Sequence, residues 1–150
     1  MNYNNFQEKD IFTSLLQTVN IMEIETNKYL NDINSIENNT FTETSENIKK
    51  LYIKKYNLFS ISLSKQISEC EKNIFSLSHL IENSDRAYDA DKTSKLSDHF
   101  DNYLQFSHSV TAFIQNNELL FSKKIAFNKK LFKMYAQNLL FSIQQYKSQI

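Results

Sequence analysis

The sequence contains no glycine and no proline in 150 residues. Average usage of these two amino acids would give about 18 of them in a chain of this length. Tight β-hairpins and phosphate-binding loops use glycine because it adopts positive φ angles without a steric penalty. The absence therefore argues against β-rich and α/β folds. It favours long helices joined by turns of Asn, Asp and Ser, since Asn and Asp tolerate left-handed backbone best after glycine.

Other features that the sequence lacks narrow the class of protein further. Cys70 is the only cysteine, so we expect no internal disulfide and no multi-cysteine metal site. The first ten residues lack the basic stretch and apolar run of a secretory signal. No segment approaches the roughly 20 apolar residues that a membrane span needs. We therefore expect a cytoplasmic protein without a transmembrane segment.

The charges cancel overall but are unevenly distributed. The 17 basic and 17 acidic residues give a formal net charge of zero, without the basic excess that nucleic-acid binding usually needs, so we expect no nucleic-acid partner. Residues 1–37 carry two lysines against six acids, whereas residues 94–150 carry seven bases against three acids. Such segments attract one another if they lie side by side in a bundle.

Apolar residues recur at alternating intervals of three and four, the spacing that gives a helix one apolar face. The pattern predicts helices over about residues 10–37, 44–82 and 94–149, with Asp10 as the N-cap of the first helix. Asn116 and Asn117 mark a break that either turns the chain into a fourth helix or leaves the third one continuous. We favour continuation or a mild kink, because two asparagines without a following loop are a weak stop signal. The prediction is one all-α domain, an elongated antiparallel bundle of three to four long amphipathic helices.

No pattern of catalytic or metal-binding residues is evident. The chain has three histidines: His79, His99 and His108. Metal sites on helices need ligands one turn apart, but no Asp or Glu lies three residues before any of these histidines, and no two of them are four residues apart. The aspartates within residues 85–92 lack the glycine and the closing glutamate of a calcium-binding loop. We therefore expect no enzymatic activity, no cofactor and no metal.

The C-terminal segment carries a wider apolar face than one helix contact requires. Apolar residues between 121 and 146 cover roughly half of the helix circumference, whereas packing against one neighbour needs a stripe of about 100°. We take this face, with the lysines that mostly lie opposite it, as the candidate interaction face: Phe121, Ile125, Phe127, Leu131, Phe132, Tyr135, Leu139, Lys129, Lys130 and Lys133. Three interpretations of this face are open: it packs between two helices of the bundle, it mediates homo-oligomerisation, or it lies on a hydrophobic granule or lipid surface. We expect the protein to form a homo-oligomer.

Two segments resemble phasins, the helical proteins that coat intracellular polyhydroxyalkanoate granules. They are residues 56–85, YNLFSISLSKQISECEKNIFSLSHLIENSD, and residues 95–125, KLSDHFDNYLQFSHSVTAFIQNNELLFSKKI. The shared pattern is a long amphipathic helix, a short break that contains Asp, and a second helix with YLQ near its start. The chain departs from phasins in using Ser, Asn and Phe where they use Ala, Glu and Gln, and in lacking a proline at the break. The resemblance implies a non-catalytic protein at a granule surface.

A helical adaptor or chaperone for secretion or assembly partners is the alternative interpretation. Such a protein holds the amphipathic helix of a partner protein in a groove. An accessory protein of a phage or mobile element would have a similar build.

Overall fold

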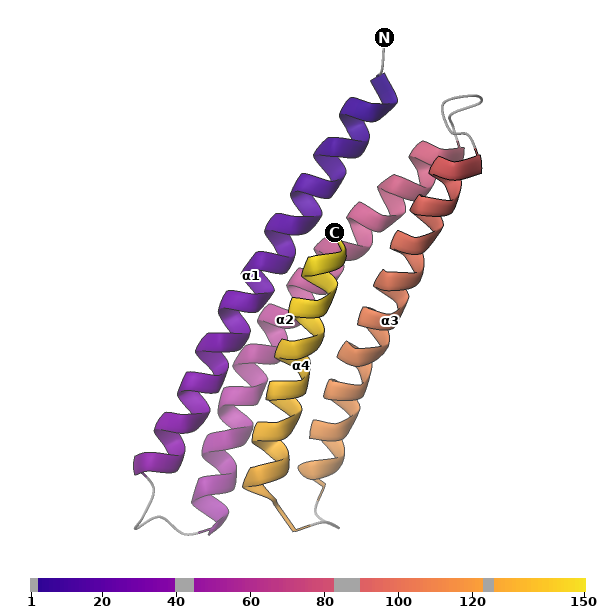
Figure 1. Ribbon diagram of the computed structural model, residues 1–150. Coiled ribbons are helices and arrows are strands. Elements are labelled where there is room, and N and C mark those ends of the chain that lie inside the picture. Colours follow the sequence, from indigo (N-terminus) through magenta and orange to yellow (C-terminus); the bar gives the residue numbers. More distant parts are fainter. Residues whose placement is uncertain (1–2, 40–44, 83–89, 123–125) are drawn as a thin grey trace.

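The computed structural model describes residues 3–39, 45–82, 90–122 and 126–150. Within these ranges the regular structure consists of four helices: α1 (Tyr3–Asn39), α2 (Ser45–Glu82), α3 (Ala90–Leu120) and α4 (Lys129–Gln149). They run side by side and antiparallel in an elongated bundle (Figure 1). The prediction of an all-α antiparallel bundle is confirmed.

Ion pairs show how α4 lies along α1. Lys147 Nζ lies 3.1 Å from Glu23 Oε1, and Lys133 Nζ lies 3.7 Å from Glu37 Oε2. The two lysines and the two glutamates are each fourteen residues apart, so the helices run antiparallel in one constant register. The basic last segment therefore meets the acidic first segment, as their opposite charges predict.

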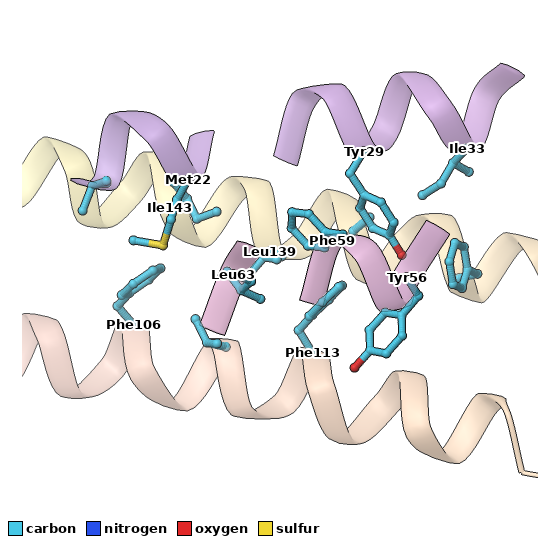
Figure 2. Packing of buried hydrophobic residues seen from close by; sticks show 14 of the residues in the cluster. Met22, Tyr29, Ile33, Tyr56, Phe59, Leu63, Phe106, Phe113, Leu139 and Ile143 are labelled. Atoms are coloured by element: carbon cyan, nitrogen blue, oxygen red, sulfur yellow. The ribbon is translucent and has the colours of Figure 1, made fainter. Parts of the chain in front are cut away.

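Aromatic rings fill the centre of the bundle (Figure 2). Tyr29 of α1 stacks on Phe59 of α2, with ring centroids 4.2 Å apart. Phe113 of α3 lies edge-on to Phe59 at 5.8 Å and also contacts Tyr56 at 5.9 Å. The backbones of α1 and α2, of α1 and α4, and of α3 and α4 approach closely. Between α2 and α3, the ring of Phe113 reaches across to Tyr56 and Phe59.

The expected continuous helix over residues 94–149 is wrong, because α3 ends at Leu120 and α4 begins at Lys129. The break does not lie at the asparagine pair either. Asn117 is fully buried inside α3, where its side-chain amide donates a hydrogen bond to the carbonyl oxygen of Phe113 at 2.8 Å. The amide is bonded to a carbonyl four residues earlier in the same helix, so Asn117 does not end α3. Asn128 caps α4 instead, since its side chain accepts a hydrogen bond from Leu131 N at 3.1 Å.

The other expected helix ends differ less. α1 begins at Tyr3, so Asp10 lies inside the helix and is not its N-cap. α3 begins at Ala90 instead of residue 94. α2, expected over residues 44–82, spans Ser45–Glu82. The apolar repeat marks where a helix is packed, and a helix extends beyond its packed part where the flanking residues allow it.

The bundle has four helices along part of its length and three at one end. α4 is the shortest helix and ends well short of the N-terminal end of α1 (Figure 1). Lys147, near the C-terminal end of α4, lies beside Glu23 of α1. Beyond this point α1 and α3 contact one another directly, with the rings of Phe12 and His99 at 4.7 Å. Leu15 and Leu96 are buried in this part of the molecule.

The buried position of Phe132 predicts a large effect on stability. Phe132→Ala removes a fully buried ring, and we expect it to lower the free energy of unfolding by about 3–5 kcal/mol. Phe141→Ala is the matched control, because Phe141 lies on the same helix and is 65% exposed, so its loss should cost less than about 0.5 kcal/mol. Urea unfolding followed by circular dichroism measures both, and equal losses would contradict this packing.

Candidate interaction surface

The apolar residues proposed for the C-terminal interaction face lie mainly in the core. Phe132 and Leu139 are fully buried in the bundle, in which α4 packs against both α1 and α3. Phe127, Leu131 and Tyr135 are half-buried and pack on the same core. Packing between two helices, the first of the three alternatives, accounts for the width of this face.

The remaining members of the proposed face have different surroundings. Phe121 follows the end of α3 and is half-buried, with its ring 5.2 Å from that of Tyr56. Lys133 pairs with Glu37, whereas Lys129 and Lys130 are exposed in the first turn of α4. Ile125 lies outside the described residues. The structure thus brings most of these residues together, but around the core and not on an outer surface.

A different row of residues, on α2, combines apolar side chains with exposure. Its positions alternate by three and four residues and follow the side of α2 that faces away from Tyr52, Tyr56 and Phe59, which are buried. We call it the outer α2 stripe: Leu51, Lys54, Leu58, Ile61, Lys65, Ser68, Lys72, Phe75 and His79, all exposed. Every large apolar residue that α2 exposes belongs to it, with exposed fractions of 40% for Leu51, 60% for Leu58, 70% for Ile61 and 65% for Phe75.

The outer α2 stripe is basic. It contains Lys54, Lys65 and Lys72 and no acidic residue. Lys72 Nζ lies 3.2 Å from Glu69 Oε1 on the side of the stripe, in an exposed pair of the kind that contributes little free energy. At one end of the stripe the ring of Phe75 lies edge-on to that of His79, with centroids 4.5 Å apart. An apolar row with lysines at intervals is therefore presented to solvent.

A groove runs along the α2–α3 seam beside this stripe. It has a volume of about 520 Å³ and is lined by Tyr56, Asn57, Ser60, Ser64, Ile114, Glu118, Phe121 and Ser122. Burial, followed by the charge of Glu118, raises the pKa of Tyr56. The hydroxyl of Ser60 donates to the carbonyl oxygen of Asn57 at 2.9 Å, so it is engaged within its own helix. The lining can form hydrogen bonds with a bound side chain.

The residues weighed as candidate metal ligands or nucleophiles lie only partly within the described ranges, since Asp85 and Asp89 fall outside them. Among the residues that the structure describes, no group of three or more His, Cys, Asp or Glu is placed to hold a metal ion. Cys70 is fully buried, and burial, with smaller contributions from Glu71 and Glu69, raises the pKa of its thiol to about 12. No helix, over its described residues, has an apolar segment long enough to cross a membrane.

Comparison of the chain with protein-family models, with curated proteins and with solved structures found no match.

Sequence reasoning missed the outer α2 stripe, although a signal for it is present. Leu51, Leu58, Ile61 and Phe75 occupy positions of one heptad register, offset from that of the buried residues. The lysines, serine and histidine at the intervening positions interrupt the apolar pattern, so a search for continuous apolar faces passes over it. A search for a second register on the same helix would have found it.

The buried Cys70 and Tyr52 predict a loss of stability at alkaline pH. Burial raises the pKa of Cys70 from 9.0 to about 12, and burial with the charge of Glu37 raises that of Tyr52 from 10.0 to about 12. Between those values the folded protein holds more protons than the unfolded chain. Its free energy of unfolding therefore falls with rising pH, by up to about 1.4 kcal/mol per pH unit for each group.

Urea unfolding at about pH 8, 10 and 11 measures this slope, over the range in which the unfolded groups ionise. Cys70→Ala removes the thiol, and we expect it to reduce the slope while leaving the tyrosine contribution. A free energy of unfolding that stays constant over this range would contradict the burial of both groups.

Proposed function

We propose that the protein is a non-catalytic helical interaction protein of the adaptor or chaperone type, which binds an amphipathic helix of another protein on its outer surface. The observation that carries the proposal is the outer α2 stripe. Its 3–4 spacing is the one by which helices pack side by side along a left-handed seam. The inner row of α2 is already used by the bundle, so the outer row is free to receive a further helix.

The exposure of the stripe supports this function energetically. Leu58, Ile61 and Phe75 are each at least 60% exposed, and apolar surface gains about 25 cal/mol per Å² when a partner removes it from water. Scattered exposed apolar residues are ordinary on protein surfaces. The four apolar residues of the stripe differ from such scattered residues, because they align on one helix face at the repeat distance of a helix seam.

A photo-cross-linking amino acid introduced in living native cells tests the proposal. At residue 61, in the stripe, we expect the cross-linking amino acid to form a covalent adduct with another protein. Placed at residue 24, it is the control, because Ile24 is 66% exposed on α1 and lies outside the stripe. Adducts of equal yield at both positions, or at neither, would contradict a binding surface on α2.

Granule coating is the second candidate function. It is supported by the resemblance of residues 56–85 and 95–125 to phasins and by exposed large apolar residues on all four helices: Ile24, Ile61, Leu104 and Phe141. The face of α4 would reach a granule only if α4 left the bundle, because Phe132 and Leu139 are buried. The outer α2 stripe needs no such rearrangement, which favours the first candidate.

Sedimentation with hydrophobic polymer particles separates the two candidates. We expect the wild-type protein to stay in solution. We expect the double variant Phe127→Ser with Leu131→Ser to be less stable, because both side chains pack on the core. Its melting temperature should fall by several degrees for each kcal/mol of unfolding free energy that is lost. A wild-type protein that sediments with the particles, and a double variant that stays in solution with an unchanged melting temperature, would instead establish granule coating through α4.

A further inference from the structure

We infer that the helix bound by the outer α2 stripe is acidic, with Asp or Glu opposite Lys54 and Lys65 and with Leu or Ile opposite Leu58, Ile61 and Phe75. This inference rests on the proposed function and specifies the chemistry of its partner. Three features of the described surface support it: the shape of the stripe, its charge, and the poor match that a second copy of this chain offers.

The shape of the stripe fits a single helix. Residues 51 to 79 extend over about 42 Å of helix at a rise of 1.5 Å per residue. The stripe is narrow, because the positions beside its centre are polar, with Asn57 and Ser64 on the side of the α2–α3 groove and Ser62 on the side of α1. Adsorption to a lipid or polymer surface requires a broad apolar face, whereas a narrow row with 3–4 spacing matches the seam of a helix pair.

The charge of the stripe sets the character of the partner. Lys54 and Lys65 lie at seam positions, where a packed helix would remove them from part of their water. Placing a lysine in a helix seam costs stability unless an opposite charge compensates it. A carboxylate on the partner supplies that charge. The aliphatic part of each lysine covers the neighbouring apolar residues.

A second copy of this chain is a poor occupant. Two α2 stripes packed together would bring lysines against lysines, since the stripe has no acidic residue. α3 exposes Leu104 and Leu119, but these leucines are fifteen residues apart, about 22 Å along the helix, whereas Leu58 and Ile61 are less than one turn apart. They cannot cover Leu58 and Ile61 together. α1 exposes Ile21 and Ile24 three residues apart, but seating them on Leu58 and Ile61 would bring Lys28 against Lys54 or Lys65. An acidic helix from another protein is therefore the better match in both apolar content and charge.

The test uses the full-length protein and two synthetic helical peptides. The acidic peptide carries Leu at the positions that face Leu58, Ile61 and Phe75 and Glu at those that face the lysines, and its twin has Lys in place of each Glu. We expect the acidic peptide to bind at least about tenfold more tightly than its twin by fluorescence anisotropy, the ratio that corresponds to 1.4 kcal/mol. Lys54→Glu with Lys65→Glu should reverse that preference.

Apolar variants show whether the peptide occupies the stripe. Ile61→Ser should weaken binding of the acidic peptide by about tenfold or more, as expected for loss of a central apolar contact. Ile24→Ser, the exposed control on α1, should leave binding unchanged. Both residues are exposed, so neither change should unfold the protein, and a thermal melt verifies this.

Four results would overturn the inference: equal binding of the two peptides, binding of neither, binding of phosphatidylglycerol vesicles that Ile61→Ser abolishes, or a wild-type dimer that Ile61→Ser dissociates in light scattering.

Failure of this inference is distinguishable from failure of the proposed function. A cross-link at residue 61 without any preference between the peptides leaves the adaptor function standing and removes the acidic partner. Absence of the cross-link removes the adaptor function itself.

Discussion

The ring of Phe132 is the contact on which the arrangement of the bundle depends. It lies 4.9 Å from the ring of Tyr52 on α2, 5.9 Å from that of Tyr29 on α1, and 5.8 Å from that of Phe121, which follows α3. One side chain of α4 therefore touches aromatic residues from all three other parts of the chain. Edge-on and tilted ring pairs of this kind contribute free energy beyond their buried area and restrict how the helices rotate about their axes.

This contact also decides which surfaces remain for a partner. With Phe132 inside, the buried apolar residues of α4 face α1 and α3, and the Lys133–Glu37 and Lys147–Glu23 pairs lie along the α1–α4 seam. The rotation of α2 is fixed in the same way, because Tyr52 must meet Phe132. Consequently Leu58 and Ile61, two residues beyond Tyr56 and Phe59 in the sequence, point outward. The exposed stripe follows from the packing of the core.

The sequence predicts the fold well and the proposed interaction surface poorly, for related reasons. Absence of glycine and proline and the 3–4 apolar spacing depend on local backbone physics, so they identify a helical bundle correctly. Asn117 misled the placement of the break, because only the structure shows its amide bonded to Phe113 within the helix. The face of α4 was recognised as unusually wide, but whether two neighbours cover it depends on contacts between distant segments.

The buried row of α2 also bears on the proposed recognition by its outer face. A partner helix that packs on a flexible segment must offset the cost of ordering that segment, whereas the row that runs from Tyr52 through Leu63 to Cys70 and Leu77 packs α2 into the bundle along its length. The outer side chains are consequently presented at fixed spacing before a partner arrives. Because the inner and outer rows are separate, substitutions in the stripe can change its charge or shape without disturbing the core. In such a bundle the inner row determines the fold, and the outer row is left to determine the partner that we propose.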